Sequence, residues 1–174
     1  MSFVDRRSQP AEREVALEKA DSFLKFGKIL KKQGVHEALR FLNSRTSHRF
    51  TAIYRFAPPL LCNLALVDSY LNEVRRGDDP PLDETYCSIV GEGEHSFTTA
   101  DARHDARLAA HPARLTVASY CGVLLRDSEG APFGTLCHFD LVPCEVPASE
   151  MPLMEAAAIE LMEAMHADPR LFGS

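Results

Sequence analysis

The sequence has no excess of positive charge. Its 19 Lys and Arg residues are outnumbered by 25 Asp and Glu residues, which gives a formal net charge of -6 at pH 7. Proteins that bind the backbone of DNA or RNA concentrate Lys and Arg on one face, because every phosphate carries a negative charge. We therefore expect no nucleic-acid partner.

A long apolar run is missing as well. No stretch reaches the roughly 18 uncharged apolar residues that a membrane-spanning helix requires. The first residues, MSFVDRRSQP, are charged where a signal peptide would have an apolar core. We expect no membrane association and a cytoplasmic location.

The cysteines do not form a recognisable pair pattern. They are odd in number and never have CxxC spacing, which argues against a disulfide framework and against a structural zinc site. No internal repeat and no low-complexity tract is visible. With 174 residues, of which 45% are hydrophobic, the chain is expected to form one folded core. The five cysteines are Cys62, Cys87, Cys121, Cys137 and Cys144.

Helical spacing of apolar residues comes first along the chain. Residues 11–33 place apolar or small side chains on one face, Gly34 ends this pattern, and residues 35–47 begin a second helix. Further apolar side chains of the first helix, such as Leu17 and Ile29, lie on other faces. We therefore assign residues 1–34 to a helical extension, which packs either against a partner subunit as a dimerisation helix or across its own sheet.

Strand patterns follow the two helices. In residues 48–56, Phe, Ala and Tyr alternate with Arg, Thr and Ile, which is typical of a strand. Residues 60–69 form a second run after two prolines, so an antiparallel pair is expected. Residues 95–102 predict an edge strand. Residues 119–140 contain two apolar runs joined by a turn that ends at Gly130, which is typical of a hairpin of central strands.

Three further segments complete an α+β pattern. Residues 82–90 predict a short helix with Asp79 as its cap, and residues 149–166 predict a closing helix capped by Ser149. Residues 101–117 are irregular and dense in Asp, Arg and His. Segments of this kind usually cover one face of a sheet and carry specificity; we call residues 101–117 the cover segment.

The hairpin resembles the C-terminal half of a GAF domain, and the segments before it fit the same family. Two positions depart from the usual motif, since Leu124 stands where Pro is common and the turn reads Glu-Gly instead of Asp-Gly. The resemblance extends over roughly residues 35–166. It rests on Glu84, Thr85, Tyr86, Cys87, Ser88, Asp101, Asp105, Arg107, Leu108, His111, Tyr120, Gly122, Val123, Leu124, Leu125, Gly130, Gly134, Thr135, Leu136, Cys137 and Asp140.

The resemblance implies the α+β GAF (profilin-like) fold. That fold has a central, mostly antiparallel sheet of five to six strands, helices on one side and a ligand-covering segment on the other. The domain would occupy residues 35–168, followed by a tail over residues 169–174. Arg107 and Asp101 would orient a ligand beneath the cover segment. The residues that we place around this pocket are Tyr54, Phe56, Tyr86, Cys87, Asp101, Arg107, His111, Tyr120 and Cys137.

Cysteine chemistry is the enzymatic alternative. One branch of the family comprises free methionine-(R)-sulfoxide reductases, which attack a sulfoxide with an activated cysteine, and Cys87 would be the catalytic residue here. The cover segment contains no cysteine, however, so the pattern of that branch is not reproduced. The dipeptide Cys137–His138 resembles a bilin attachment site, but it lies on a strand, where neighbouring side chains point to opposite faces.

The polar residues suggest two further kinds of site, a metal site and an anion-binding site. The histidines His95, His104 and His111 have no HxH or HxxxH spacing, so we expect no metal site. Arg103, Arg107 and Arg114 would suit an anionic ligand, yet Asp101 and Asp105 are close enough to pair with them. The sequence alone does not separate a phosphate pocket from a salt-bridge network.

We expect a sensory or regulatory GAF module that binds a small molecule and has no output domain of its own. It would act through another protein or as a homodimer, and the sequence favours this role over an enzyme. The sequence names neither the ligand nor a cofactor. The alternatives are the reductase based on Cys87 and a dimerisation scaffold that binds no ligand.

Overall fold

The computed structural model describes residues 8–172. Short 3₁₀ turns lie at Leu82–Glu84, Ala102–His104, Ala106–Leu108, Pro112–Leu115 and Pro169–Phe172. The helices and strands are α1 (Ser8–Gln33), α2 (Val35–Asn43), β1 (Phe50–Ala57), β2 (Leu60–Asp68), α3 (Cys87–Gly93), β3 (Phe97–Thr99), β4 (Ser119–Arg126), β5 (Pro132–Asp140) and α4 (Glu150–Ala167).

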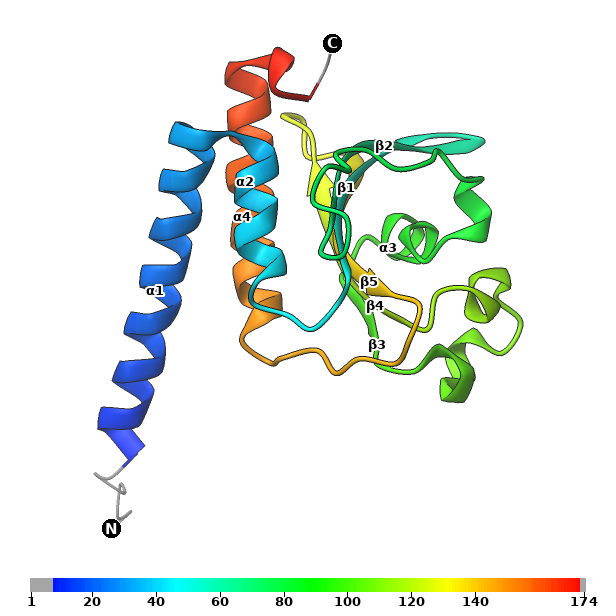
Figure 1. The fold of residues 1–174 in the computed structure, drawn as a ribbon, viewed down its shortest axis with the longest axis horizontal. Helices are drawn as coiled ribbons and strands as arrows, with labels where there is room; N and C mark the ends of the chain where they lie inside the picture. Colours follow the sequence, from blue (N-terminus) through cyan, green and yellow to red (C-terminus); the bar gives the residue numbers. More distant parts are fainter. Residues whose placement is uncertain (1–7, 173–174) are drawn as a thin grey trace.

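The five strands form one antiparallel sheet in the order β2-β1-β5-β4-β3. Figure 1 shows α2 and α4 against one face of this sheet, α1 outside them, and α3 with the cover segment on the opposite face. The expected α+β GAF architecture, with helices on one side and a covering segment on the other, is confirmed.

The alternation of side chains along the strands divides the interior into two cores. Ile53, Val123 and Leu136 point toward the helices, whereas Ala52 and Tyr54 point toward the cover segment. Strands of a sheet buried on both faces require apolar residues at nearly every position. The long apolar runs of the hairpin follow from this requirement, because β4 and β5 are covered on both sides.

Two glycines fix the hairpin. Gly130 has a φ of 80°, a left-handed conformation that glycine adopts without steric cost, and this is the turn position expected from the sequence. Gly134 meets a different requirement. A Cβ atom at this position would overlap the backbone oxygen of Tyr54 on β1, so only glycine lets β5 approach β1 this closely.

The helix α1 has two differently packed halves. Its C-terminal half contributes Phe26 and Leu30 to the helix-side core, although we assigned both residues to an extension. Residues 10–20 are all exposed, and Figure 1 shows this half standing clear of the rest of the molecule. Phe172, in the expected tail, also packs against the helix-side core.

Some local expectations were wrong. The helix expected over residues 82–90 is a 3₁₀ turn followed by α3, and Asp79 does not cap it. Instead, Asp79 Oδ1 accepts a hydrogen bond from the backbone N–H of Asn63 at 2.7 Å. Ser149 does precede α4, but its side chain makes no capping hydrogen bond. In residues 8–172, no helix is long and apolar enough to cross a membrane.

Candidate functional site

A cavity of about 270 Å³ lies between the sheet and the cover segment. Its floor comes from β1, β2, β4 and β5, and its roof comes from the start of α3 and the end of the cover segment. Most of its walls are apolar or aromatic. The lining residues are Tyr54, Leu61, Pro80, Glu84, Thr85, Tyr86, Cys87, Ala113, Thr116, Val117, Tyr120, Cys137 and Phe139.

Five of the nine predicted site residues line this cavity: Tyr54, Tyr86, Cys87, Tyr120 and Cys137. The rings of Tyr86 and Tyr120 meet edge to face, with centroids 5.5 Å apart. The Tyr86 hydroxyl donates a hydrogen bond to the carbonyl oxygen of Val117 at 2.8 Å, which ties α3 to the cover segment. Burial raises the pKa of Tyr86 to about 12, so the phenol is neutral at physiological pH.

A cluster of polar hydrogens surrounds the thiol of Cys87. The Thr135 hydroxyl donates a hydrogen bond to Cys87 Sγ at 3.1 Å, and the Tyr120 hydroxyl lies 3.3 Å from the same sulfur. The Cys137 thiol lies close enough to influence the same sulfur. Burial raises the pKa of the Cys87 thiol, but Cys137 and the hydroxyl groups of Thr135 and Tyr120 outweigh burial and lower the pKa below its ordinary value.

The other four predicted residues lie outside the cavity. Arg107 forms a two-point ion pair with Asp105, with Nη2 and Oδ2 2.6 Å apart, and donates to the carbonyl oxygen of Thr98. Its guanidinium also stacks over the Phe97 ring at 4.6 Å. Arg107 therefore fastens the cover segment to β3 and lies outside the cavity around which we expected it.

Asp101, His111 and Phe56 also have roles in packing. Asp101 caps the turn at Ala102–His104 and contacts the His104 ring at 2.8 Å. The His111 side chain accepts a hydrogen bond from the backbone N–H of Ala113, and its ring packs against Tyr86. Phe56 packs with the cover-side core next to Gly91. None of the three belongs to the cavity lining.

The charge around the cavity is low. Among the lining residues only Glu84 carries a charge, and its side chain is exposed at the rim. The arginines of the cover segment do not line the cavity; Arg114, for example, donates to the backbone oxygen of Ala109. The sequence left open whether the arginines of the cover segment bind an anionic ligand or pair with aspartates. Arg107 pairs with Asp105.

Residues missed by sequence reasoning complete the site. Ala113, Thr116 and Val117 roof the cavity, and nothing in their residue types marks them as lining. Thr135 was detectable in principle. It is two residues before Cys137 on β5, and side chains at that spacing share one face of a strand.

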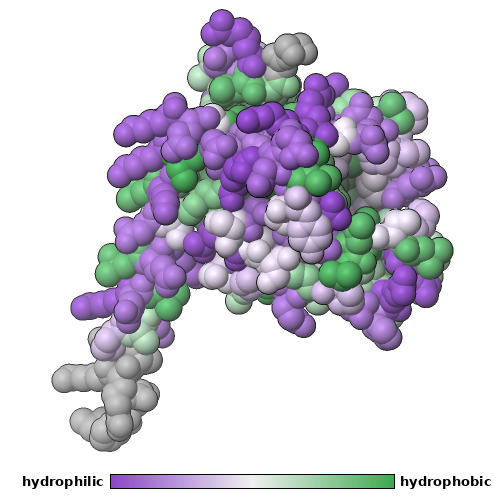
Figure 2. Space-filling view, in the orientation of Figure 1, coloured by the Kyte–Doolittle hydropathy of each residue, from purple (hydrophilic) through white to green (hydrophobic). Residues whose placement is uncertain are grey.

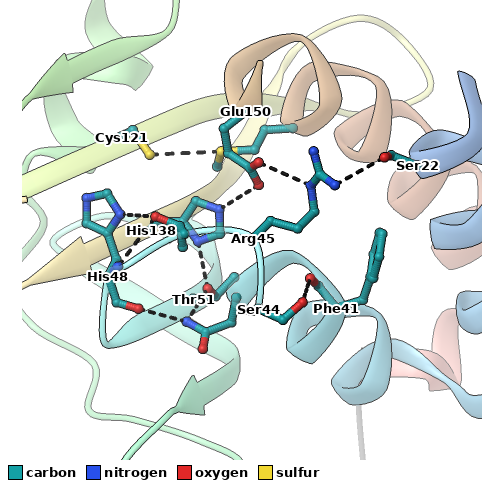
Figure 3. Close-up of polar contacts among 12 residues, drawn as sticks. Ser22, Phe41, Ser44, Arg45, His48, Thr51, Cys121, His138 and Glu150 are labelled. Atoms are coloured by element: carbon teal, nitrogen blue, oxygen red, sulfur yellow. Dashed lines mark hydrogen bonds and ion pairs between the residues drawn. The ribbon is translucent and has the colours of Figure 1, made fainter. Parts of the chain in front are cut away.

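A second cluster of buried polar residues lies on the opposite face of the sheet (Figure 3). Thr51 Oγ1 is 2.6 Å from His138 Nδ1, and His138 Nε2 is 3.3 Å from Glu150 Oε1. Hydroxyl, imidazole and carboxylate in series resemble the arrangement used for acyl transfer. However, all three side chains are fully buried and none lines a cavity. We interpret this cluster as structural.

Figure 3 also shows how this cluster connects the helices. Glu150 at the start of α4 forms an ion pair with Arg45, and Arg45 donates a hydrogen bond to Ser22 of α1. His138 faces these helices while its neighbour Cys137 lines the cavity. The expected separation of the two side chains across β5 is confirmed, and they cannot share one cofactor.

Two other features of residues 8–172 do not make a stronger site. A groove of about 850 Å³ runs between α4 and β4, but its walls include the exposed Ile159 and the carboxylates Glu94, Asp127, Glu155 and Glu163. In the same described part of the chain, no group of three or more His, Cys, Asp or Glu residues is arranged to hold a metal ion.

The fold agrees with that of solved GAF domains. The GAF domain of an Acinetobacter phosphoenolpyruvate-protein phosphotransferase superposes with a TM-score of 0.66 at 16% identity, covering 87% of this chain and 96% of that one. Free methionine-R-sulfoxide reductase from Neisseria meningitidis gives 0.66 at 13% identity over 90% and 93%. The chromophore-binding domain of a bacteriophytochrome from R. palustris gives 0.66 at 11% over 87% and 61%.

The sequence itself gives no such match. No protein-family model matches it, and a search of curated proteins finds no similar sequence. The structural neighbours are below 20% identity, so they establish the GAF fold and leave the chemistry to be argued from the site.

Proposed function

We propose that this protein is a sensory GAF module that binds a small molecule in the cavity between the sheet and the cover segment. The observation that carries the proposal is the cavity itself, which is walled by buried aromatic rings and thiols at the position where a covering segment closes over the sheet. Concave, mostly apolar sites with a few polar groups are the usual form of ligand pockets. A scaffold without a ligand would have a filled core here.

The lining favours a ligand without an anionic group. No Arg or Lys side chain lines the cavity, and the one charged residue at its rim is the carboxylate of Glu84. Burying a phosphate or carboxylate without a charged partner costs several kcal/mol. A small, largely apolar molecule that is neutral or carries a positive charge fits best, and hydroxyl groups of the tyrosines would orient it.

Output through a partner or a homodimer is the second part of this proposal. The exposed surface of α1 supports it, because Val15, Leu17 and Leu24 present large apolar side chains to solvent. Figure 2 shows hydrophobic residues scattered among hydrophilic ones along this helix. A cytoplasmic location, which keeps thiols reduced, remains part of the proposal.

A thermal-shift screen tests ligand binding, since a compound that binds only the folded state must raise the melting temperature. We expect neutral and cationic compounds to stabilise the protein and anionic nucleotides to have no effect. Ala113→Leu should fill the roof of the cavity and abolish the shift. Ala106→Leu, the same change at an exposed position of the cover segment, should retain it. A shift that persists in Ala113→Leu, or one caused chiefly by nucleotides, would contradict the proposal.

A cysteine-dependent sulfoxide reductase is the second candidate. The hydrogen bonds to Cys87 favour it, and several fold neighbours are free methionine-R-sulfoxide reductases. The absence of a basic lining residue weighs against it, because an amino-acid substrate carries a carboxylate. Turnover of free methionine-(R)-sulfoxide with a dithiol reductant, lost in Cys87→Ser, would establish this activity. No turnover by the wild type would end it.

A further inference from the structure

Two of the five cysteines, Cys87 and Cys137, line the same cavity. Cys87 is the first residue of α3, and Cys137 lies on the cover-side face of β5. Both thiols line the cavity, and they lie close enough for each to shift the pKa of the other. Both side chains are otherwise buried, so a reagent reaches them only by entering the cavity.

The other three cysteines have no comparable surroundings. Cys121 is buried on the opposite face of the sheet, where its Sγ lies 4.0 Å from Met154 Sδ, and burial raises its pKa to about 12. Cys62 and Cys144 are partly exposed and line neither the cavity nor the groove between α4 and β4. These three cysteines therefore serve as internal controls for a reaction that is confined to the cavity.

The surroundings of the pair make its two thiols unequal. Thr135 and Tyr120 direct their hydroxyl groups at Cys87 Sγ, and such donors stabilise a thiolate. Burial raises the pKa of the Cys137 thiol, which stays protonated beside it. One sulfur suited to attack and a second in the same cavity wall are the two parts of a reactive dithiol.

We propose that Cys87 and Cys137 are a redox-active dithiol that hydroperoxides entering the cavity oxidise to a disulfide. The Cys87 thiolate attacks the terminal oxygen of a hydroperoxide, the O–O bond breaks, and the leaving alkoxide or hydroxide takes up a proton. Cys87 is then a sulfenic acid. The Cys137 sulfur displaces its hydroxyl group, which leaves as water with the proton of the Cys137 thiol. Two thiols and one hydroperoxide thus give a disulfide, one alcohol or water from the leaving group, and one water.

This redox chemistry does not depend on ligand binding. Oxidation is measured on ligand-free protein, and ligand binding is measured on reduced protein. Either proposal can therefore be contradicted without the other. Where both hold, disulfide formation changes the wall of the same cavity, because Cys87 can no longer accept its hydrogen bonds from Thr135 and Tyr120 as a thiolate.

Peptide mapping of the wild-type protein tests the pair directly. Reduced protein is treated with hydrogen peroxide or tert-butyl hydroperoxide, alkylated, digested and analysed by mass spectrometry. We expect a cross-linked peptide pair that joins Cys87 to Cys137 and is restored to two thiols by dithiothreitol. If Cys62 or Cys144 is fully oxidised while Cys87 and Cys137 remain thiols, the dithiol assignment is overturned; this result requires no variant to fold.

Variants assign the roles of the two sulfurs. Cys137→Ser should stop the reaction at a sulfenic acid on Cys87, which a dimedone probe traps, and Cys87→Ser should leave Cys137 unmodified. Cys121→Ser, which changes a buried thiol on the other face, should form the disulfide at the wild-type rate. A Cys121-dependent reaction would overturn the assignment.

A phenol pair tests the hydrogen bond to Cys87. Tyr120→Phe removes a donor to the sulfur, whereas Tyr70→Phe removes the hydroxyl of an exposed tyrosine outside the cavity. A rise of about one pKa unit lowers the thiolate fraction about tenfold, and the more basic thiolate is about threefold more nucleophilic. We expect Tyr120→Phe to slow oxidation about threefold and Tyr70→Phe to leave the rate unchanged. Equal rates in both variants would remove Tyr120 from the mechanism.

Discussion

Single residues determine how closely the strands on either side of the cavity approach. Gly134 is the clearest case, because its α-carbon lies against the backbone oxygen of Tyr54 and leaves no space for a side chain. Gly130 differs, since a Cβ there would meet no atom within 4 Å and only its left-handed φ favours glycine. Gly134 is thus required because no side chain fits, and Gly130 is favoured because of its backbone conformation.

Alanine substitutions at the two glycines distinguish these two requirements. Gly134→Ala must push β5 away from β1, and we expect a loss of about 3 kcal/mol in the free energy of unfolding. Gly130→Ala should lose about 1–2 kcal/mol, the cost of a left-handed alanine. Urea denaturation followed by circular dichroism measures both. A Gly134→Ala variant as stable as Gly130→Ala would show that the strands separate easily.

His48 predicts a specific dependence of stability on pH. Burial and the neighbouring His138 lower the pKa of His48 from 6.5 to about 4, and its Nε2 has no hydrogen-bond partner. Between about pH 6.5 and pH 4 the unfolded chain therefore binds a proton that the folded chain does not. The free energy of unfolding should fall as the pH decreases through this range, by up to about 3 kcal/mol in total.

Denaturation curves at several pH values test this dependence. His48→Asn should remove that part of the slope, whereas His95→Asn, a change at an exposed histidine, should retain it. An unchanged slope in His48→Asn would mean that another group is responsible.

The site residues show what a sequence can and cannot identify at this scale. Tyr54, Tyr120 and Cys137 lie on strands whose alternation fixes the face of each side chain, so their position in the cavity was predictable. We expected Arg107 at the cavity because a guanidinium group suits an anionic ligand. Which group it pairs with depends on the folded structure and cannot be read from its residue type. Asp105, two residues away, accepts two hydrogen bonds from its guanidinium and keeps it at the surface.

At the scale of the elements, the main question is whether a partner covers the exposed part of the helix α1. Its C-terminal half is held by the core, and its N-terminal half contacts nothing within the described chain that buries it. A helix of this length with a free half and exposed leucines is more stable when a partner covers it, because isolated helical segments are marginal in water.

Charge substitution on this helix tests for a dimer. The double variant Leu17→Glu/Leu24→Glu should sediment as a monomer of 19.3 kDa, whereas we expect the wild type to have twice this mass. Lys19→Gln/Lys32→Gln alters the net charge equally without removing apolar surface and should remain dimeric. A wild-type monomer at micromolar concentration in analytical ultracentrifugation would contradict a homodimer through α1.

The elements differ in how far the sequence predicts them. The hairpin of β4 and β5 was predictable, since two apolar runs flank a turn with Asp127 and Gly130. The cover segment has no periodicity, because its short 3₁₀ turns are held by local caps from Asp101, Asp105 and His111. Its residue types therefore indicate a covering role without showing which side chains reach the cavity.

At the scale of the whole molecule, the sheet separates two different interiors. The helix-side face holds the ion pair of Glu150 with Arg45, and the cover-side face holds the cavity with its thiols and phenols. The strand β5 contributes to both through the neighbours Cys137 and His138. A chemical change in the cavity and the packing of the helices thus meet on one strand.

The most direct test is an experimental structure with a compound that raises the melting temperature. A bound molecule should lie between Tyr86, Tyr120 and Cys137, beneath Ala113 and the neighbouring roof residues, without a contact to Arg107. If the compound lies instead in the groove between α4 and β4, or against the arginines of the cover segment, the cavity is not the ligand site and the central claim is wrong.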